Sequence, residues 1–280
     1  MQFFQAIIMG IVQGLSEFLP ISSSAHLVFS SNFYKYFAKI QPHTVDINQE
    51  VFFDIMLHLG TLIAVLIFFR KDIIEIIKSF YLGFTQKNYS DKNFKLGIYI
   101  IIGTFLTVLV AYPLSPISEK LVATPEITSV LLIVTGIFLI LSEWYNKKYL
   151  NKKDINIKSS VIIGFAQGLA SLPGFSRSGF TIASALFSGV ERSYAARYSF
   201  LLSIPIILGA SMVYPLASID TSEITNYNWP AIISGTIVSG IVGYYCIKYF
   251  LKFVSKFSLS IFGYYCITVG IICAIFFTII

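Results

Sequence analysis

Long apolar runs alternate with short polar segments along the whole chain. Six of the runs reach the roughly 20 residues that an α-helix needs to cross a hydrocarbon core of about 30 Å. We predict six membrane-spanning helices, near residues 51–69, 96–112, 127–145, 197–217, 229–247 and 259–280. Because backbone polar groups in a bilayer must be satisfied internally, this pattern indicates an all-α polytopic membrane protein.

Two further apolar regions, residues 1–38 and 159–190, are each interrupted midway by polar and helix-breaking residues. The interruptions read SEFLPISSSAH in the first region and SLPGFSRSG in the second. Each half is too short to span a bilayer, and irregular backbone at membrane depth is tolerated only inside protein or beside a cavity. Both regions are therefore predicted to be re-entrant helix-loop-helix hairpins.

The two interrupted regions match each other at an offset of about 154 residues. The matching pairs are Gly10 with Gly164, Gln13 with Gln167, Gly14 with Gly168 and Leu15 with Leu169, followed after a one-residue gap by Leu19 with Leu172, Pro20 with Pro173 and Ser23 with Ser176. We predict one membrane domain, residues 1–280, in which a basic cytoplasmic loop, 146–158, joins repeats at about 1–145 and 159–280. Each repeat has one hairpin and three spans, so the second repeat must be inverted relative to the first.

Composition and charge fit this architecture. The 280 residues are 56% hydrophobic and 12% charged, with a mean hydropathy of +0.77, whereas soluble domains are about 25% charged. The net charge of +6 does not indicate a nucleic-acid partner, because the cations gather between spans, at 70–95, 147–158 and 248–256. If these segments are cytoplasmic, both termini and the loops at 113–126 and 218–228 lie outside.

The two interruptions also hold the polar groups that are expected at membrane depth. An ionisable group there costs about 2.5 to 3.5 kcal/mol on insertion scales, so such groups usually have a function. The catalytic candidates are Glu17, Ser23 and His26 in the first loop and Arg177 in the second, and the substrate-binding candidates are Gln13, Ser22, Ser24, Ser176, Ser178 and Thr181. A hydroxyl, an imidazole, a carboxylate and a guanidinium form the set that phosphoryl transfer requires.

Each catalytic candidate has a chemical reason. The planar fork of Arg177 can bind two phosphate oxygens and stays protonated. His26 follows Ser23 by three residues, so within one helical turn its imidazole can approach that hydroxyl. The serines precede a helix that begins near Ser24, whose N–H groups and dipole favour an anion. Glu17 either orients His26 or binds a divalent cation that bridges phosphate oxygens, and the sequence leaves both roles open.

Asp54 and His58 are a second pair of ionisable residues inside an apolar run. They lie four residues apart in the first predicted span and therefore share one helix face. The spacing fits a packing pair near the outer boundary and a cavity wall equally well, so their role stays open.

The segments QGLSEFLPISSSAHL at 13–27 and PGFSRSGFT at 173–181 resemble the two signature motifs of the undecaprenyl-diphosphate phosphatase family, the bacitracin-resistance type. The resemblance covers essentially the whole chain. It implies hydrolysis of undecaprenyl pyrophosphate to undecaprenyl phosphate and inorganic phosphate, which recycles the lipid carrier for peptidoglycan and other envelope polymers. It also implies that Glu17, Ser23, His26 and Arg177 occupy catalytic positions and that a divalent cation, Mg²⁺ or Ca²⁺, takes part.

The resemblance further implies a multi-pass protein of the bacterial inner (plasma) membrane with a polyprenyl pyrophosphate lipid as its partner, and it is compatible with a homodimer. The competing function is a transporter or flippase, because inverted repeats with broken helices at the midplane are a transporter architecture. Transport needs alternating access but no nucleophile, so the set of Ser23, His26 and Arg177 favours hydrolysis. A phosphatase of the phosphatidic-acid type is disfavoured, because Ala183 stands where that family has a nucleophilic His.

Overall fold

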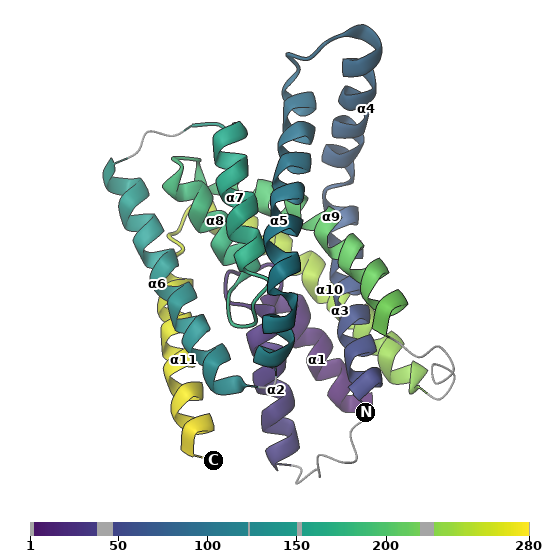
Figure 1. Cartoon of the computed structure of the whole chain (residues 1–280), viewed down its shortest axis with the longest axis vertical. Helices are drawn as coiled ribbons and strands as arrows, with labels where there is room; N and C mark the ends of the chain where they lie inside the picture. Colours follow the sequence, from purple (N-terminus) through teal and green to yellow (C-terminus); the bar gives the residue numbers. More distant parts are fainter. Residues whose placement is uncertain (1–2, 38–46, 123, 150–152, 219–226, 280) are drawn as a thin grey trace.

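A computed structural model describes residues 3–37, 47–122, 124–149, 153–218 and 227–279. The described residues form eleven α-helices (Figure 1). In chain order these are α1 (Phe3–Ser16), α2 (Ser23–Phe37), α3 (Ile47–Phe68), α4 (Arg70–Gln86), α5 (Lys92–Val122), α6 (Pro125–Tyr149), α7 (Ile157–Leu169), α8 (Arg177–Phe187), α9 (Arg192–Ser218), α10 (Trp229–Val254) and α11 (Ser260–Ile279). Residues 219–226 of the predicted outer loop and 150–152 of the predicted basic loop lie outside the described residues.

Among the described residues, six helices are long and apolar enough to cross a membrane. Their spans are Gln49–Phe68, Lys92–Val122, Pro125–Lys148, Arg192–Met212, Trp229–Val254 and Ser260–Ile279. The apolar helices α1 and α7 have only 14 and 13 residues and are too short to cross. The six predicted spans and the all-α polytopic class are therefore confirmed.

The four short helices form two hairpins that enter from opposite ends of the molecule: α1 with α2, and α7 with α8 (Figure 1). Their connecting loops meet midway. The Ser22 hydroxyl donates to the carbonyl of Phe175 at 3.2 Å, and the Ser178 hydroxyl donates to the carbonyl of Leu19 at 2.9 Å. Helix α1 begins and α11 ends at the same lower end in Figure 1, as an odd number of spans per repeat requires. The predicted re-entrant hairpins and inverted arrangement are confirmed.

The inversion is clearest in the packing of the first helix of each hairpin. Helix α1 lies against α10, and α7 lies against α5, so each repeat places its short helix beside a span of the other repeat. A Cβ atom on Gly10 would lie 2.5 Å from the carbonyl oxygen of Gly235, and one on Gly164 would lie 2.5 Å from that of Gly103. Small residues let membrane helices approach this closely. The two repeats are consequently interlocked.

Two segments predicted as loops are helical instead. Within 70–95, α4 and the start of α5 form a helical extension, and Asp91 caps α5 by accepting from the N–H groups of Asn93 and Phe94, each at 2.9 Å. The bond from Phe94 holds the pKa of Asp91 below its usual range. At the other end, α5 continues through Pro113 and Pro116 to Val122. Prolines are tolerated inside membrane helices where neighbouring groups satisfy the freed backbone.

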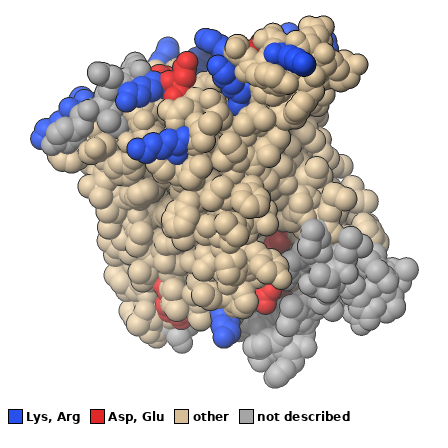
Figure 2. All heavy atoms as spheres, turned by 45° about the horizontal axis from the view of Figure 1, so that its top comes forward, with Lys and Arg blue, Asp and Glu red and all other residues tan. Residues whose placement is uncertain are grey.

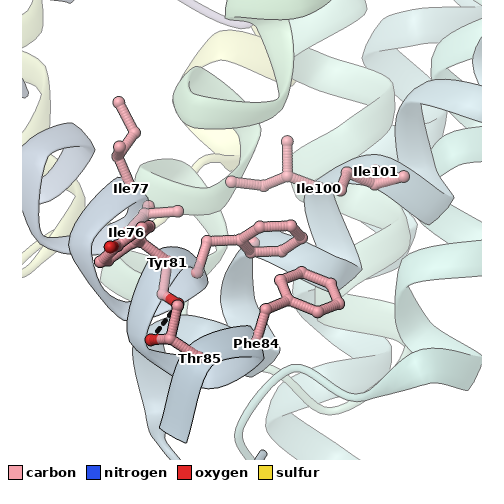
Figure 3. A pocket seen from close by; sticks show the side chains of 9 residues that line it. Ile76, Ile77, Tyr81, Phe84, Thr85, Ile100 and Ile101 are labelled. Atoms are coloured by element: carbon pink, nitrogen blue, oxygen red, sulfur yellow. Dashed lines mark hydrogen bonds between the residues drawn. The ribbon is translucent and has the colours of Figure 1, made fainter. Parts of the chain in front are cut away.

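The extension carries an apolar groove of about 520 Å³ between α4 and α5 (Figure 3). Its lining includes Ile76, Ile77, Tyr81 and Phe84 of α4 and Ile100 and Ile101 of α5. The Thr85 hydroxyl at its edge already donates to the carbonyl of Tyr81 at 2.9 Å. The groove presents apolar surface rather than a set of reactive groups, so it does not have the character of an active site.

Positive charge gathers at one end of the molecule. Figure 2 shows the Lys and Arg side chains clustered over the upper end of the Figure 1 view, where α4 and the start of α5 lie. The positive-inside rule predicts that this end faces the cytoplasm. By the same rule, the end where α1 begins and α11 ends is predicted to face outside.

Candidate active site

The two loops enclose a cavity of about 690 Å³ together with α3, α5 and α9. Six predicted site residues line it: Glu17, Ser23, Ser24, Ser176, Arg177 and Ser178. Much of the remaining wall is apolar and includes Val51, Ile55, Val122, Ile206 and Ile207. These wall residues come from the first half of α3, the end of α5 and the second half of α9, so the cavity lies toward the end of the molecule where α1 begins and α11 ends.

The first loop is shaped by the turn at Ser22 and by the packing of Phe18. Helix α1 ends at Ser16, and the chain turns through Ser22, whose φ of 69° lies in the left-handed region that non-glycine residues rarely adopt. The Ser22 hydroxyl accepts from the N–H of Ala25 at 3.2 Å and so caps α2. Beside this turn, Phe18 packs edge-on against Phe200 of α9, with ring centroids 5.3 Å apart. These contacts hold Glu17 and Ser23 in place.

The second loop is fixed by Gly174 and by Thr135 of α6. Gly174 has a φ of +101°, and a Cβ atom there would lie 2.4 Å from the carbonyl oxygen of Thr128. The Thr135 hydroxyl donates to the carbonyl of Gly174 and accepts from the N–H of Ser176, each at 3.2 Å. Ser176 then caps α8 by accepting from the N–H of Gly179 at 3.1 Å. Arg177 is thereby held at the first position of a rigid helix.

The caps correct the predicted alignment of the repeats. Ser22 caps α2 and Ser176 caps α8 in the same way, and each hydroxyl also contacts the serine two residues later, Ser24 at 3.1 Å and Ser178 at 3.3 Å. The prediction that Ser23 corresponds to Ser176 is therefore wrong. The one-residue gap in the alignment is confined to the loops, and the repeats are again aligned at their original offset where the second helices begin. Ser23 corresponds to Arg177, and each opens the second helix of its hairpin.

Glu17 connects the two hairpins. Its carboxylate is buried, with only 4% of the residue exposed. One oxygen, Oε1, pairs with the guanidinium of Arg177. The other, Oε2, accepts from the Ser23 hydroxyl at 2.7 Å and from the Gln13 amide at 3.1 Å. A serine hydroxyl is thus bonded to a carboxylate that can take its proton, next to a cation from the opposite repeat.

The cavity also suits an anion. Helices α2 and α8 both begin at the cavity. The N–H groups of a first helical turn point along the helix axis, so those of α2 and α8 point toward the cavity. Two helix N-termini add partial positive charge to the full charge of Arg177. A phosphate group in this position would meet hydroxyls, N–H groups and a guanidinium at once.

His26 does not meet Ser23, contrary to the predicted approach of its imidazole. Its Nδ1 lies 2.8 Å from the carbonyl oxygen of Ser22, its Nε2 lies 2.8 Å from the Tyr265 hydroxyl, and its ring stacks on that of Tyr265. The three-residue spacing also turns His26 partly away from Ser23 around the helix, toward α11. Of the two roles left open for Glu17, orientation of His26 is not what the structure shows, because Glu17 contacts Ser23 and Arg177 instead.

Three of the predicted binding residues lie behind the cavity rather than in its wall. Gln13 is buried and holds Glu17, and Ser22 shapes the first turn. The buried Thr181 hydroxyl contacts the carbonyl of Arg177 at 2.8 Å and the Ser199 hydroxyl at 2.6 Å. These side chains support the residues that face the cavity, so direct substrate binding by them is not what their placement indicates.

Asp54 and His58 belong to the cavity wall, which resolves the alternative that the sequence left open. The Nε2 atom of His58 lies 3.7 Å from Glu17 Oε2. Glu119 of α5 also lines the cavity, although it was assigned to an outer loop. Its position follows from the continuation of α5 past its two prolines, for which the sequence offered no signal.

The described residues do not fit a cation held by the protein alone. They contain no group of three His, Cys, Asp or Glu side chains placed to hold a metal ion. Both oxygens of Glu17 already face positive or hydrogen-bond donor groups, those of Arg177, Ser23 and Gln13.

Comparison with known proteins gives consistent matches over nearly the full chain. Residues 6–272 match the family described as bacitracin resistance protein BacA. The chain is 43% identical to an undecaprenyl-diphosphatase of Methanobrevibacter smithii, with 97% of this chain and 96% of that protein covered. It is 38% identical to the undecaprenyl-diphosphatase of Geotalea daltonii, with 99% and 98% covered, and 39% identical to that of Halothermothrix orenii, with 97% and 96% covered.

Proposed function

Because the chain belongs to the bacitracin resistance protein BacA family, we propose that it hydrolyses undecaprenyl diphosphate to undecaprenyl phosphate and inorganic phosphate. One observation carries the proposal: Ser23 and Arg177, from opposite hairpins, meet on the two oxygens of the buried Glu17. The reaction returns the lipid carrier to the synthesis of peptidoglycan and other envelope polymers. A flippase would not need this hydroxyl, carboxylate and guanidinium in contact.

The cavity accommodates both parts of such a substrate. The diphosphate group would bind between Arg177 and the starts of α2 and α8, where positive charge and N–H donors converge. The isoprenoid chain would lie along the apolar wall that Val51, Ile55 and Ile206 help to form. With this division, the terminal phosphorus would lie next to Ser23.

The contacts of Glu17 support a first chemical step in which this carboxylate acts as the base. Ser23 Oγ attacks the terminal phosphorus while Glu17 Oε2 accepts the hydroxyl proton. A bond forms between Oγ and phosphorus, and the bond from phosphorus to the bridging oxygen breaks, so that undecaprenyl phosphate leaves with the electron pair. Water then hydrolyses the phosphoserine and releases inorganic phosphate. Arg177 stabilises the charge that spreads over the phosphate oxygens in both steps.

The placement of the cavity supports hydrolysis on the outer side of the membrane. Its wall lies toward the end opposite the Lys and Arg cluster, and the positive-inside rule makes that end the outer one. The protein is a multi-pass membrane protein, and we propose the bacterial inner (plasma) membrane as its location. The site is complete within one chain, so a homodimer would carry two independent sites.

A divalent cation, Mg²⁺ or Ca²⁺, fits this proposal as a companion of the substrate. Mg²⁺ usually binds through one or two carboxylates together with substrate phosphates, rather than in an all-protein cage. The absence of a three-ligand group among the described residues agrees with that mode. Phosphate release measured with and without a chelator tests this part of the proposal.

Phosphate release by the purified chain in detergent tests the function itself. Detergent micelles have no two sides, so a pure transporter shows no turnover there. We expect release of inorganic phosphate and undecaprenyl phosphate in equal amounts, and loss of both in Glu17→Gln. Translocation of the lipid in vesicles without release in detergent would contradict the proposal.

A further inference from the structure

The two histidines near the loops are tethered alike but face different surroundings. In each, Nδ1 lies 2.8 Å from the backbone carbonyl oxygen four residues earlier, that of Ser22 for His26 and that of Asp54 for His58. A carbonyl oxygen can only accept, so Nδ1 carries the proton in both neutral rings and Nε2 offers its lone pair. The surroundings of Nε2 therefore decide what each histidine can do.

The lone pair on Nε2 of His26 already has a hydrogen-bond donor. Its Nε2 lies 2.8 Å from the Tyr265 hydroxyl, which can donate to it, and the two rings stack with centroids 5.7 Å apart. His26 is also absent from the residues that line the cavity. It ties α2 to α11 and is not placed to move a proton in the site.

The Nε2 atom of His58 instead points at the reacting groups. It lies 3.7 Å from Glu17 Oε2, the same oxygen that accepts the Ser23 hydroxyl at 2.7 Å. His58 lines the cavity with Ser23 and Arg177, and its side chain is 31% exposed while that of Glu17 is 1% exposed. A distance of 3.7 Å is too long for a direct hydrogen bond. It leaves His58 beside the site, with its lone pair available to a water molecule in the cavity.

The backbone around His58 is firmly held. The Ser239 hydroxyl of α10 donates to the carbonyl of Leu57 at 2.8 Å, and the buried Thr61 hydroxyl donates to the carbonyl of His58 at 2.9 Å. A Cβ atom on Gly60 would lie 2.3 Å from the carbonyl oxygen of Thr236, so α3 and α10 are in close contact here. A proton acceptor must be held in a fixed position to be effective, and this packing provides it.

From this geometry we infer that His58 is the general base for the second half of the reaction, an inference that rests on the proposed function. His58 Nε2 takes a proton from water, and the water oxygen forms a bond to the phosphorus of phosphoserine 23. The bond from phosphorus to Ser23 Oγ breaks, and Glu17 returns to Oγ the proton that it accepted in the first half. Inorganic phosphate leaves, and protonated His58 releases its proton to bulk water. Glu17 is thus the base in the first half of the reaction, and His58 is the base in the second.

The inference predicts that His58→Asn separates the two halves. Asparagine can keep an N–H group near the carbonyl of Asp54 but places no base at the position of Nε2. With substrate labelled in its terminal phosphate, we expect a burst of about one undecaprenyl phosphate per chain and labelled protein at nearly the same amount. Steady-state phosphate release should fall at least about 10²-fold, the lower end of what a general base contributes.

His26→Asn is the matched control, because it makes the same change in the histidine that faces Tyr265. It should not accumulate label, and equal labelling of both variants would overturn the assignment. The double variant Ser23→Ala with His58→Asn should carry no label, since the acceptor hydroxyl is gone. His58→Gln is a second test of the same position, in case the His58→Asn protein does not fold. A burst of undecaprenyl phosphate itself shows that the variant is folded and can carry out the first half of the reaction.

Two other outcomes overturn the inference while leaving the proposed function intact. One is wild-type phosphate release by His58→Asn. The other is an equal loss of burst and turnover without labelled protein in a variant that elutes as wild type from size-exclusion chromatography. The proposed function fails separately, if the wild-type chain releases no undecaprenyl phosphate.

Discussion

At the scale of single residues, the site is organised around one buried carboxylate. Glu17 is surrounded by groups that stabilise its negative charge: the Arg177 guanidinium, the Ser23 hydroxyl and the Gln13 amide. A buried charge without partners would be costly, so each of these contacts also keeps the site folded. Orientation of Glu17 is the role that the structure supports for Gln13, which the sequence suggested as a direct ligand of the substrate.

Arg177→Lys tests whether the shape of the cation matters. Lysine keeps the charge but loses the planar fork that binds two oxygens together. We expect kcat/KM for phosphate release to fall at least about 10²-fold, because a single ammonium group cannot contact Glu17 and two phosphate oxygens in the same geometry. Near-wild-type turnover would show that the site requires only a positive charge.

The meeting of the two polar loops was predictable from the sequence, but the directions of their side chains were not. The two polar interruptions correctly indicated that Glu17, Ser23 and Arg177 meet. The orientation of His26 depends on Tyr265, which is 239 residues away in sequence and gives no local signal. Helical spacing put Asp54 and His58 on one face, but only the packing of α3 decides that this face borders the cavity.

At the scale of helices, close glycine contacts hold the interlocked repeats together. Gly164→Ala would place a methyl group 2.5 Å from the carbonyl oxygen of Gly103, so α7 and α5 must separate. Overpacking of this kind typically costs about 1–3 kcal/mol. We expect a lower temperature of unfolding in detergent and reduced activity, because α7 leads directly into the loop that carries Arg177.

The matched control for that helix contact is Gly209→Ala in α9. A Cβ atom at Gly209 meets nothing within 4 Å, and replacing glycine with alanine in a helix is favourable by about 0.5–1 kcal/mol. Its unfolding temperature should stay the same or rise. Equal destabilisation of both variants would contradict the close contact between α7 and α5.

The helix contacts also show what the sequence analysis missed. The repeat was recognised in α1 and α7, where glycines flank a glutamine, but not in the spans that they contact. Gly103 and Thr107 correspond to Gly235 and Ser239 at a different offset, and both pairs contact the short helix of the other repeat. Insertions between the spans change the offset, and α4, an additional helix between α3 and α5, is one of them.

At the scale of the whole molecule, hydrolysis on the outer side requires a fixed orientation of the protein in the membrane. Lys87 lies at the end of α4, in the charged extension, and Lys120 lies near the opposite end of α5. In a chain without its three buried cysteines, Cys246, Cys266 and Cys273, single cysteines can replace these exposed lysines. An impermeant thiol reagent on intact cells should label Lys120→Cys, and should label Lys87→Cys only after permeabilisation. The reverse pattern would place the cavity on the cytoplasmic side.

The central claim is that two inverted hairpins of one chain form a single catalytic unit. The most direct measurement is kcat/KM for phosphate release in Ser23→Ala, Arg177→Ala and the double variant, under single-turnover conditions with labelled substrate. Residues that act as one unit are strongly non-additive. We expect each single change to cost at least about 10³-fold, the lower end of what an arginine contributes in phosphoryl transfer, and the double change to cost less than about tenfold more. Losses that multiply in the double variant would mean that the two hairpins act independently, and would contradict the account.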